Sequence, residues 1–223
     1  LLERMLARLF YKNVNEYFVQ TISMKRKLEF YYSKKMNKVT LFPFIDNETY
    51  TREAINNDKI IDFIYVSEGH QHKNHAILLN AWVHLAKQGI FPMLTLTLST
   101  DYQDIIINIE KLKKKYNISV NNLGYIDPKT VIELYLNAKA LIFPSLIESY
   151  GLPLIEAKLT GLPIIASELD YVRDVCIPSE TFDPLSEVSI ARAVMRFLKL
   201  KNNSDKEYNA NDFVTYVFDD LQK

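Results

Sequence analysis

The chain has 223 residues, of which 48% are hydrophobic and 24% charged, a composition typical of a folded globular protein and not of a disordered one. Basic and acidic residues both number 27, so the zero net charge gives no support to a nucleic-acid-binding function. No apolar run reaches the roughly 20 residues that a membrane-spanning helix needs.

The single cysteine, Cys176, cannot form a disulfide within the chain, which favours a cytoplasmic location. Residues 1–4 show neither a signal-peptide pattern nor an initial methionine. At ~150 residues per domain, the length favours one full domain plus part of another. We therefore expect a fragment of a longer cytoplasmic protein.

Residues 1–44 are expected to form an initial helix, a strand at 17–21, a helix at 24–32 and a strand at 37–44. Such a piece is too small to fold alone, so we interpret it as the remnant of a preceding domain. Polar residues 45–59 are predicted to be a linker.

Charge is uneven along the chain. Residues 1–40 carry nine basic and three acidic groups, a net charge of +6. A basic helical surface favours peripheral contact with the inner, anionic face of a membrane. The alternative is a solvated helix face with no partner.

From residue 60 onward, short apolar runs alternate with segments of helical spacing. Strands are expected at residues 60–66, 93–98, 118–123, 140–144, 163–166 and 181–182. Helices are expected at residues 75–87, 105–116, 129–138, 152–160, 170–175 and 185–199. This alternation predicts that residues 60–200 form an α/β domain, with a Rossmann-like parallel sheet and helices on both of its faces. Residues 201–223 are expected to form a helical tail. Ligands of such sheets bind at the carboxyl ends of the strands.

Several common motifs are absent from the sequence, namely GxGxxG, GxxxxGK[ST], HExxH and GxSxG. His70, His72 and His75 lie close together in the chain, but their spacing does not place all three on one helix face. We therefore expect no metal site.

The most informative stretch is 143–157, where a buried strand ends in a polar turn and a new helix begins. Gly151 permits a positive φ or the close approach of a ligand, and Pro153 suits the first turn of a helix. The free N–H groups of a helix N-terminus bind anions such as phosphate. Glu156 lies one turn into the helix, where its carboxylate can accept hydrogen bonds from both hydroxyls of a vicinal diol, such as that of a ribose. With Glu148 in the turn, this pattern suits a ligand that carries both phosphate and sugar.

Residues 143–166 read Phe-Pro-Ser-Leu-Ile-Glu-Ser-Tyr-Gly-Leu-Pro-Leu-Ile-Glu-Ala-Lys-Leu-Thr-Gly-Leu-Pro-Ile-Ile-Ala. They closely resemble the Glu-x7-Glu region of the retaining glycosyltransferases of family 4, which have the two-domain GT-B architecture. The resemblance covers roughly residues 60–200, the nucleotide-sugar-binding domain of that family, and includes the segments 65–82 and 124–126. It implies that residues 1–44 are the last β-α unit of the acceptor-binding domain.

The resemblance also implies roles for individual residues. Glu148 and Lys73 would be the catalytic pair: Glu148 would hydrogen-bond hydroxyls of the donor sugar, and Lys73 would offset the charge of the leaving diphosphate. The other implied donor contacts are Glu156 with the ribose, the backbone of Tyr150, Gly151 and Leu152 with the sugar and diphosphate, and Gly124, Tyr125 and Ile126 with the base.

One departure from the family concerns the end of the first strand of this domain. Many members have Gly-Arg there, whereas residues 67–68 of this chain are Ser-Glu and no arginine occurs at 53–172. A subgroup with Lys-Asn-His in the following loop, as at residues 73–75, also lacks the arginine. We expect His72 or Asn74 to compensate for it.

The sequence thus predicts a retaining glycosyltransferase that moves a sugar from a GDP- or UDP-sugar to a glycan or lipid-linked acceptor, in bacterial surface polysaccharide biosynthesis. No prosthetic group is implied. The fragment is expected to bind nucleotide but to transfer little sugar. Two alternatives stay open: a GT-B nucleotide-sugar epimerase, which needs no acceptor, and a non-catalytic transferase-like domain that serves as an assembly partner, which the missing arginine favours.

Overall fold

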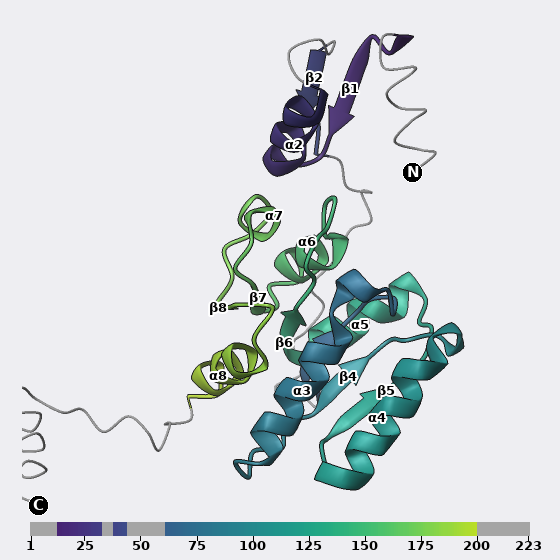
Figure 1. Cartoon of the computed structure of the whole chain (residues 1–223), viewed down its shortest axis with the longest axis vertical. Helices are drawn as coiled ribbons and strands as arrows, with labels where there is room; N and C mark the ends of the chain where they lie inside the picture. Colours follow the sequence, from purple (N-terminus) through teal and green to yellow (C-terminus); the bar gives the residue numbers. More distant parts are fainter. Residues whose placement is uncertain (1–12, 33–37, 44–60, 200–223) are drawn as a thin grey trace, which may run out of the picture.

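The computed structural model describes residues 13–32, 38–43 and 61–199 (Figure 1). The helix expected at the start of the chain, the linker at 45–59 and the tail at 201–223 lie outside these ranges. Within the described residues, no helix is long and apolar enough to cross a membrane.

The main element of the fold is a parallel sheet with the strand order β5-β4-β3-β6-β7-β8. The strands are β3 (Ile61–Tyr65), β4 (Leu94–Leu96), β5 (Val120–Asn122), β6 (Ala138–Phe143), β7 (Ile164–Ser167) and β8 (Glu180–Phe182). Successive strands add outward from β3 in one direction, and then outward from β6 in the other. This is the order of a Rossmann-like sheet, and it confirms the predicted fold class.

Helices cover both faces of this sheet. They are α3 (His75–Ala86), α4 (Gln103–Tyr116), α5 (Pro128–Asn137), α6 (Leu152–Leu159), α7 (Asp170–Arg173) and α8 (Glu187–Phe197). Helix α3 packs between α4 and α8, whereas α5 and α6 pack against β3, β6 and β7 (Figure 1). The predicted helices on both faces are therefore confirmed.

The core forms around the central strand β3. Phe63, Ile64 and Tyr65 are fully buried, because a central parallel strand is covered on both faces. The ring of Phe63 meets the ring of Trp82 from α3 edge to face at 5.7 Å. The indole N–H of Trp82 donates to the Pro92 carbonyl at 2.8 Å, so its polar atom is satisfied inside the core.

The outer strands β4 and β5 are shorter than predicted. The side-chain amide of Asn122 replaces the backbone ladder there: its Oδ1 accepts from the Leu98 N–H at 2.8 Å and its Nδ2 donates to the Leu98 carbonyl at 3.0 Å. Because a side chain and not the backbone bonds to Leu98, the strands end here although the apolar sequence pattern continues.

A second, smaller unit precedes the large sheet. It consists of β1 (Glu16–Val19), α2 (Ile22–Tyr32) and β2 (Lys38–Leu41), and its two strands pair in parallel. Figure 1 shows this unit beyond α6 and α7, at one end of the molecule.

Asn74 joins three connecting segments of the large sheet. It has a φ of 63° between a 3₁₀ turn at Gln71–Lys73 and α3, a conformation that asparagine tolerates better than most residues. Its buried Nδ2 donates to the Pro144 carbonyl after β6 at 3.1 Å and to the Pro184 carbonyl before α8 at 2.7 Å. The ends of β3, β6 and β8 are thereby linked through one side chain.

We expect Asn74→Ala to lower the free energy of unfolding by about 3 kcal/mol, because it leaves two buried carbonyls without a donor and places a Cβ-bearing residue without a compensating side chain at positive φ. Asn74→Gly also loses the hydrogen bonds but relieves the backbone, so its loss should be smaller by about 1 kcal/mol. Urea unfolding of the three proteins measures both values. Equal stability of the alanine variant and the unmodified chain would contradict this role.

Candidate functional site

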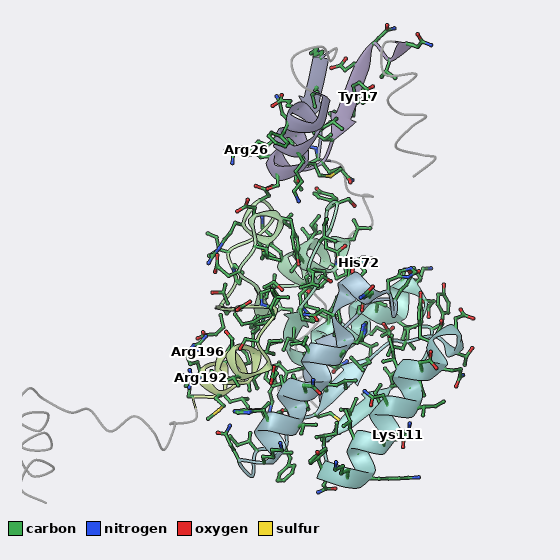
Figure 2. The ribbon with its side chains drawn as sticks, viewed as in Figure 1. Tyr17, Arg26, His72, Lys111, Arg192 and Arg196 are labelled. Atoms are coloured by element: carbon green, nitrogen blue, oxygen red, sulfur yellow. The ribbon has the colours of Figure 1, made fainter. Side chains whose placement is uncertain are left out.

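The candidate site lies at the crossover point of the sheet, between the carboxyl ends of β3 and β6. Strand order reverses here, and open α/β sheets bind ligands in the crevice formed at such a point. The loop after β3 carries residues 67–74 and the loop after β6 carries residues 144–151. Figure 2 places His72 at this end of the domain, well away from Lys111, Arg192 and Arg196.

An ion pair between Lys73 and Glu148 spans the two loops. The Lys73 Nζ lies 2.8 Å from the Glu148 Oε1, and the two side chains are 17% and 10% exposed. The two predicted catalytic residues, 75 positions apart in the chain, are therefore brought together at the crossover. The pair places one positive and one negative charge side by side, within reach of solvent.

Tyr65, the last residue of β3, forms hydrogen bonds to both loops. Its hydroxyl donates to the Lys73 carbonyl at 2.8 Å and lies 2.9 Å from the Ser145 Oγ, which can donate to it in turn. Burial raises the pKa of Tyr65, so this hydroxyl keeps its proton. One protonated side chain on the last residue of β3 thus sets the spacing of the loops that carry Lys73 and Glu148.

The loop after β6 is further fixed by its backbone. The Leu146 N–H donates to the His72 carbonyl at 2.8 Å, which ties this loop to the loop after β3. The Ser145 carbonyl accepts from the Tyr171 hydroxyl at 2.7 Å and from the Ser167 hydroxyl at 3.1 Å. The start of the loop is therefore well anchored before it reaches Glu148.

Helix α6 begins immediately after this loop. Its N-cap is Gly151, with a φ of 75° and no side chain to bind the first N–H groups of the helix. A Cβ at Gly151 would lie 3.1 Å from the Leu154 Cδ1, so both conformation and space favour glycine. Pro153 lies in the first turn, as predicted. Tyr150 is buried and Leu152 is half exposed. The positive end of α6 is thus free of a capping side chain beside Glu148.

Glu156 lies on the side of α6 that faces α5. Its Oε2 accepts a hydrogen bond from the Tyr135 hydroxyl at 3.0 Å. Burial raises the pKa of Glu156, and the Tyr135 hydrogen bond opposes that rise. The carboxylate is therefore oriented by a fixed donor, a contact that the sequence did not reveal.

Gly124, Tyr125 and Ile126 follow β5, two strands away from β3 on the same edge of the sheet. Gly124 has a φ of 79°, and the Tyr125 side chain is 78% exposed. Asp127 then caps α5 by accepting from the N–H groups of Lys129 and Thr130. The segment predicted to surround a base is thus an exposed turn at the carboxyl edge.

Tyr102 is a residue of this edge that the sequence did not single out. Its ring lies directly on Gly69, where an added Cβ would come within 2.4 Å of the Tyr102 Cγ. The His70 ring meets Tyr102 edge to face at 5.7 Å and stacks with His72 at the same distance. The available signal was that the chain has only five glycines, one of them close behind β3, where a glycine can indicate the close approach of another group.

Glu68 is the residue that the resemblance aligns with the arginine of other members, and its carboxylate lies 2.9 Å from the His70 Nε2. Asn74 was expected to compensate for the arginine. Both of its amide hydrogens are instead used by the Pro144 and Pro184 carbonyls, so Asn74 has no N–H left for a phosphate. His72, the residue before Lys73, is half-buried in the loop after β3. No group of three or more potential metal ligands occurs among the described residues.

His75, the first residue of α3, lies beneath the site. It is 3% exposed, its Nε2 is 3.2 Å from the Ser67 Oγ, and its buried Nδ1 has no hydrogen-bond partner. Burial, and secondarily the charge of Lys73, lowers the pKa of His75 to about 4. His75 is therefore neutral in the folded protein at physiological pH.

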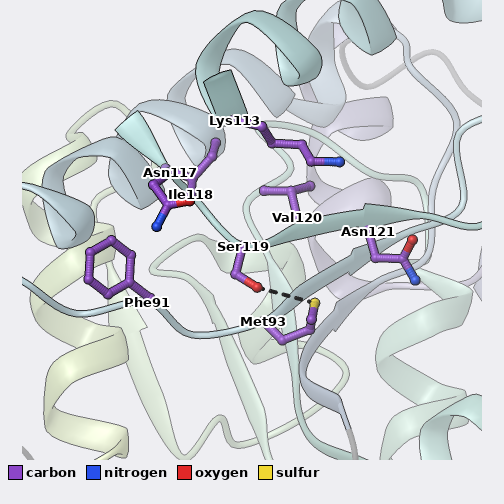
Figure 3. A pocket seen from close by; sticks show the side chains of 8 residues that line it. All are labelled: Phe91, Met93, Lys113, Asn117, Ile118, Ser119, Val120 and Asn121. Atoms are coloured by element: carbon purple, nitrogen blue, oxygen red, sulfur yellow. Dashed lines mark hydrogen bonds between the residues drawn. The ribbon is translucent and has the colours of Figure 1, made fainter. Parts of the chain in front are cut away.

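Figure 3 shows a pocket whose lining residues stand at and before the amino ends of β4 and β5, whereas the crossover site lies at the carboxyl ends of the strands. Its lining residues are Phe91, Met93, Lys113, Asn117, Ile118, Ser119, Val120 and Asn121. The Ser119 hydroxyl donates to the Met93 sulfur at 3.5 Å across it. None of the predicted site residues lines this pocket.

Comparison with known proteins identifies a family. Residues 46–212, more than half of the chain, match the family described as "Glycosyl transferases group 1". The serotype-specific mannosyltransferase WbdA of Escherichia coli is 29% identical over 163 residues, covering 67% of this chain and 19% of WbdA. The O-antigen chain mannosyltransferase RfbU of Salmonella typhimurium is 27% identical over 172 residues, covering 72% of this chain and 44% of RfbU. The chain thus spans less than half the length of these relatives.

Solved structures share the fold. Sucrose-phosphate synthase from Thermosynechococcus elongatus superposes with a TM-score of 0.73 at 22% identity, covering 87% of this chain and 52% of that one. HepE of Anabaena, solved in complex with UDP and glucose, superposes with a TM-score of 0.70 at 14% identity, covering 88% and 57%. The chain thus shares the Rossmann-like fold of these GT-B proteins and covers about half of each.

We expect the buried His75 to make stability depend on pH. Its pKa of about 4 in the folded state lies below 6.5, the ordinary value, so the unfolded chain binds more protons between these two pH values. Stability should therefore fall as the pH drops from 6.5 to 4, by about 3 kcal/mol relative to His75→Gln, which does not titrate. Urea unfolding of both proteins at several pH values measures the difference, and a difference that stays constant with pH would contradict the assignment.

Proposed function

The chain belongs to the group 1 glycosyl transferases, and on this premise we propose that it forms the donor-binding part of a retaining glycosyltransferase of family 4, in the subgroup with Lys-Asn-His after the first strand. The observation that carries the proposal is the Lys73–Glu148 pair at the crossover of the sheet. It offers a cation and a carboxylate at the place where an α/β sheet binds a nucleotide.

The two charges suit the two parts of a nucleoside-diphosphate sugar. A diphosphate at the crossover competes with Glu148 for the ammonium of Lys73, because both are anions. Glu148 then accepts hydrogen bonds from hydroxyls of the sugar. The open N-terminus of α6, with the backbone of Tyr150, Gly151 and Leu152, supplies further N–H groups and positive potential for the phosphates.

The remaining donor contacts follow from the same placement. Glu156, oriented by Tyr135, holds the ribose hydroxyls. The exposed turn at Gly124, Tyr125 and Ile126 surrounds the base. His72, beside Lys73, supplies the extra N–H that other members obtain from arginine.

In the proposed reaction, the bond from the anomeric carbon to the diphosphate breaks while the acceptor oxygen bonds to the same face of that carbon. Because the new bond forms on the face that the diphosphate leaves, the anomeric configuration is retained. The leaving phosphate takes the proton of the acceptor hydroxyl. The chain contributes position and charge: Lys73 and the end of α6 stabilise the negative charge that develops on the diphosphate.

The names of the relatives suggest the donor sugar and the pathway. WbdA and RfbU are named as mannosyltransferases, and RfbU as one of the O-antigen chain. We propose a hexosyl donor, with mannose as the first candidate, attached to GDP or UDP. The proposed acceptor is a glycan or a lipid-linked glycan of a surface polysaccharide, reached in the cytoplasm with help from the basic N-terminal region at the membrane.

The proposed domain organisation assigns residues 1–44 to the acceptor-side domain, 45–59 to the linker, 60–200 to donor binding and 201–223 to a helical tail. Its support is that β1 and β2 pair with each other and not with the strands of the large sheet. Because the chain spans less than half the length of WbdA and RfbU, we expect the 223 residues to bind the donor and to transfer little sugar.

Thermal shift with GDP, UDP, ADP, dTDP and their sugars tests the proposal. A nucleotide present at about 100 times its Kd should add about 2.7 kcal/mol of stability. Lys73→Ala and Glu156→Gln should remove most of this gain, because they remove the phosphate cation and the charged acceptor for the ribose. The matched controls Lys113→Ala and Glu133→Gln, on α4 and α5, should keep it.

The same experiment separates the alternatives. Stabilisation by one nucleotide that both site variants abolish supports the donor site and identifies the base. Absence of stabilisation by every nucleotide contradicts it and favours the non-catalytic assembly partner, for which Glu68 in place of arginine is the specific observation. Conversion of a nucleotide sugar without acceptor would indicate the epimerase.

A further inference from the structure

The N-terminal unit touches the large domain beside the loop that carries Glu148. Val19, Thr21 and Ser23 are the buried residues among the described positions of this unit, and they cluster where β1 leads into α2. Helix α2 packs against α7, as Figure 1 shows. Burial in this small unit is thus concentrated at its contact with the large domain.

Asp174 makes the closest polar contact between the two units. Its Oδ2 accepts from the Ser23 N–H in the first turn of α2, at 2.7 Å. Helix α2 has no acidic residue in its own first turn, so Asp174 supplies the negative charge that the positive end of a helix favours. A charge-assisted hydrogen bond of this kind is stronger than a neutral one.

Thr21 makes the second contact, and it reaches the Glu148 loop. As the N-cap of α2, its Oγ1 accepts from the Met24 N–H at 3.2 Å. The same hydroxyl donates to the carbonyl of Ser149, the residue after Glu148, at 3.5 Å. One capping side chain therefore connects the start of α2 to the backbone next to the carboxylate.

The loop after β6 is otherwise anchored at its beginning, through Ser145 and Leu146. Ser149 is exposed, and Thr21 approaches the loop at that point, on the side away from the sheet. Glu148 itself is held by Lys73, and the backbone next to it is supported by the large domain at the start of the loop and by the N-terminal unit at Ser149.

We propose that Asp174 and Thr21 are positioning residues, which couple the docking of the N-terminal unit to the placement of Glu148. The inference rests on the proposed function, because Glu148 is taken to contact the donor sugar. It predicts that loss of the contact weakens recognition of the sugar part of the donor and leaves recognition of the nucleotide part unchanged.

Hydrogen exchange of the 223-residue chain tests the contact without any ligand. Asp174→Ala should raise exchange several-fold in the first turn of α2 and in residues 147–151, while α3 stays protected. Asp174→Asn, which keeps an acceptor oxygen, should show a smaller increase. Asp104→Ala removes an exposed aspartate in the first turn of α4 and should leave exchange in both segments unchanged. Unchanged exchange in Asp174→Ala would overturn the proposal.

Binding measurements test the coupling to the sugar. Asp174→Ala and Thr21→Val should weaken binding of GDP-mannose or UDP-glucose by ~5-fold, the loss of about one hydrogen bond, and leave binding of GDP or UDP unchanged. An equal loss for nucleotide and nucleotide sugar indicates general destabilisation and overturns the coupling. If the unmodified chain binds no nucleotide, the proposed function fails, whereas the exchange experiment still decides the contact.

Discussion

The geometry of the candidate site depends on the buried amide of Asn74. This amide donates to carbonyls that lie 70 and 110 residues further along the chain, after β6 and β8. Its own left-handed backbone turns the chain from Lys73 into α3. Because Lys73 precedes Asn74 and Pro144 starts the loop that carries Glu148, this side chain helps to place both partners of the ion pair. The Tyr65 hydroxyl and the Leu146 N–H hold the same two loops.

Within that frame, the site combines fixed positions with an accessible pair of charges. Ion pairs that are partly buried contribute little net stability, because desolvation offsets their attraction. Net stability therefore gives little reason for a pair of Lys73 and Glu148 at this position. Tyr65 beneath the pair is kept protonated and neutral by burial, and His75 is kept neutral there mainly by burial. Tyr65 and His75 therefore add no charge beneath the pair, and Glu148 is the anion that the ammonium of Lys73 contacts.

The fold could be predicted from the sequence in outline, and its details could not. The apolar run of β3 and the helical spacing of α3, with Trp82 on its buried stripe, give local signals that the core confirms. The ends of β4 and β5 gave no such signal, because the Asn122 side chain ends their ladder through a contact 24 residues away. The order of the strands could not be predicted either, because it depends on the edge of the sheet to which each connecting helix returns the chain.

The sequence by itself determined the fold class, the approximate elements and the residues offered for the site, because hydrophobic periodicity and the 143–166 motif lie within short stretches of chain. Only the tertiary structure decided which groups meet. It set Tyr102 on Gly69, committed the Asn74 amide to two carbonyls, gave Glu156 its partner Tyr135, and placed Asp174 on the end of α2. These partners lie from 21 to 151 residues apart. Contacts at such separations follow from the packing of whole elements, which leaves no local pattern in the amino-acid order.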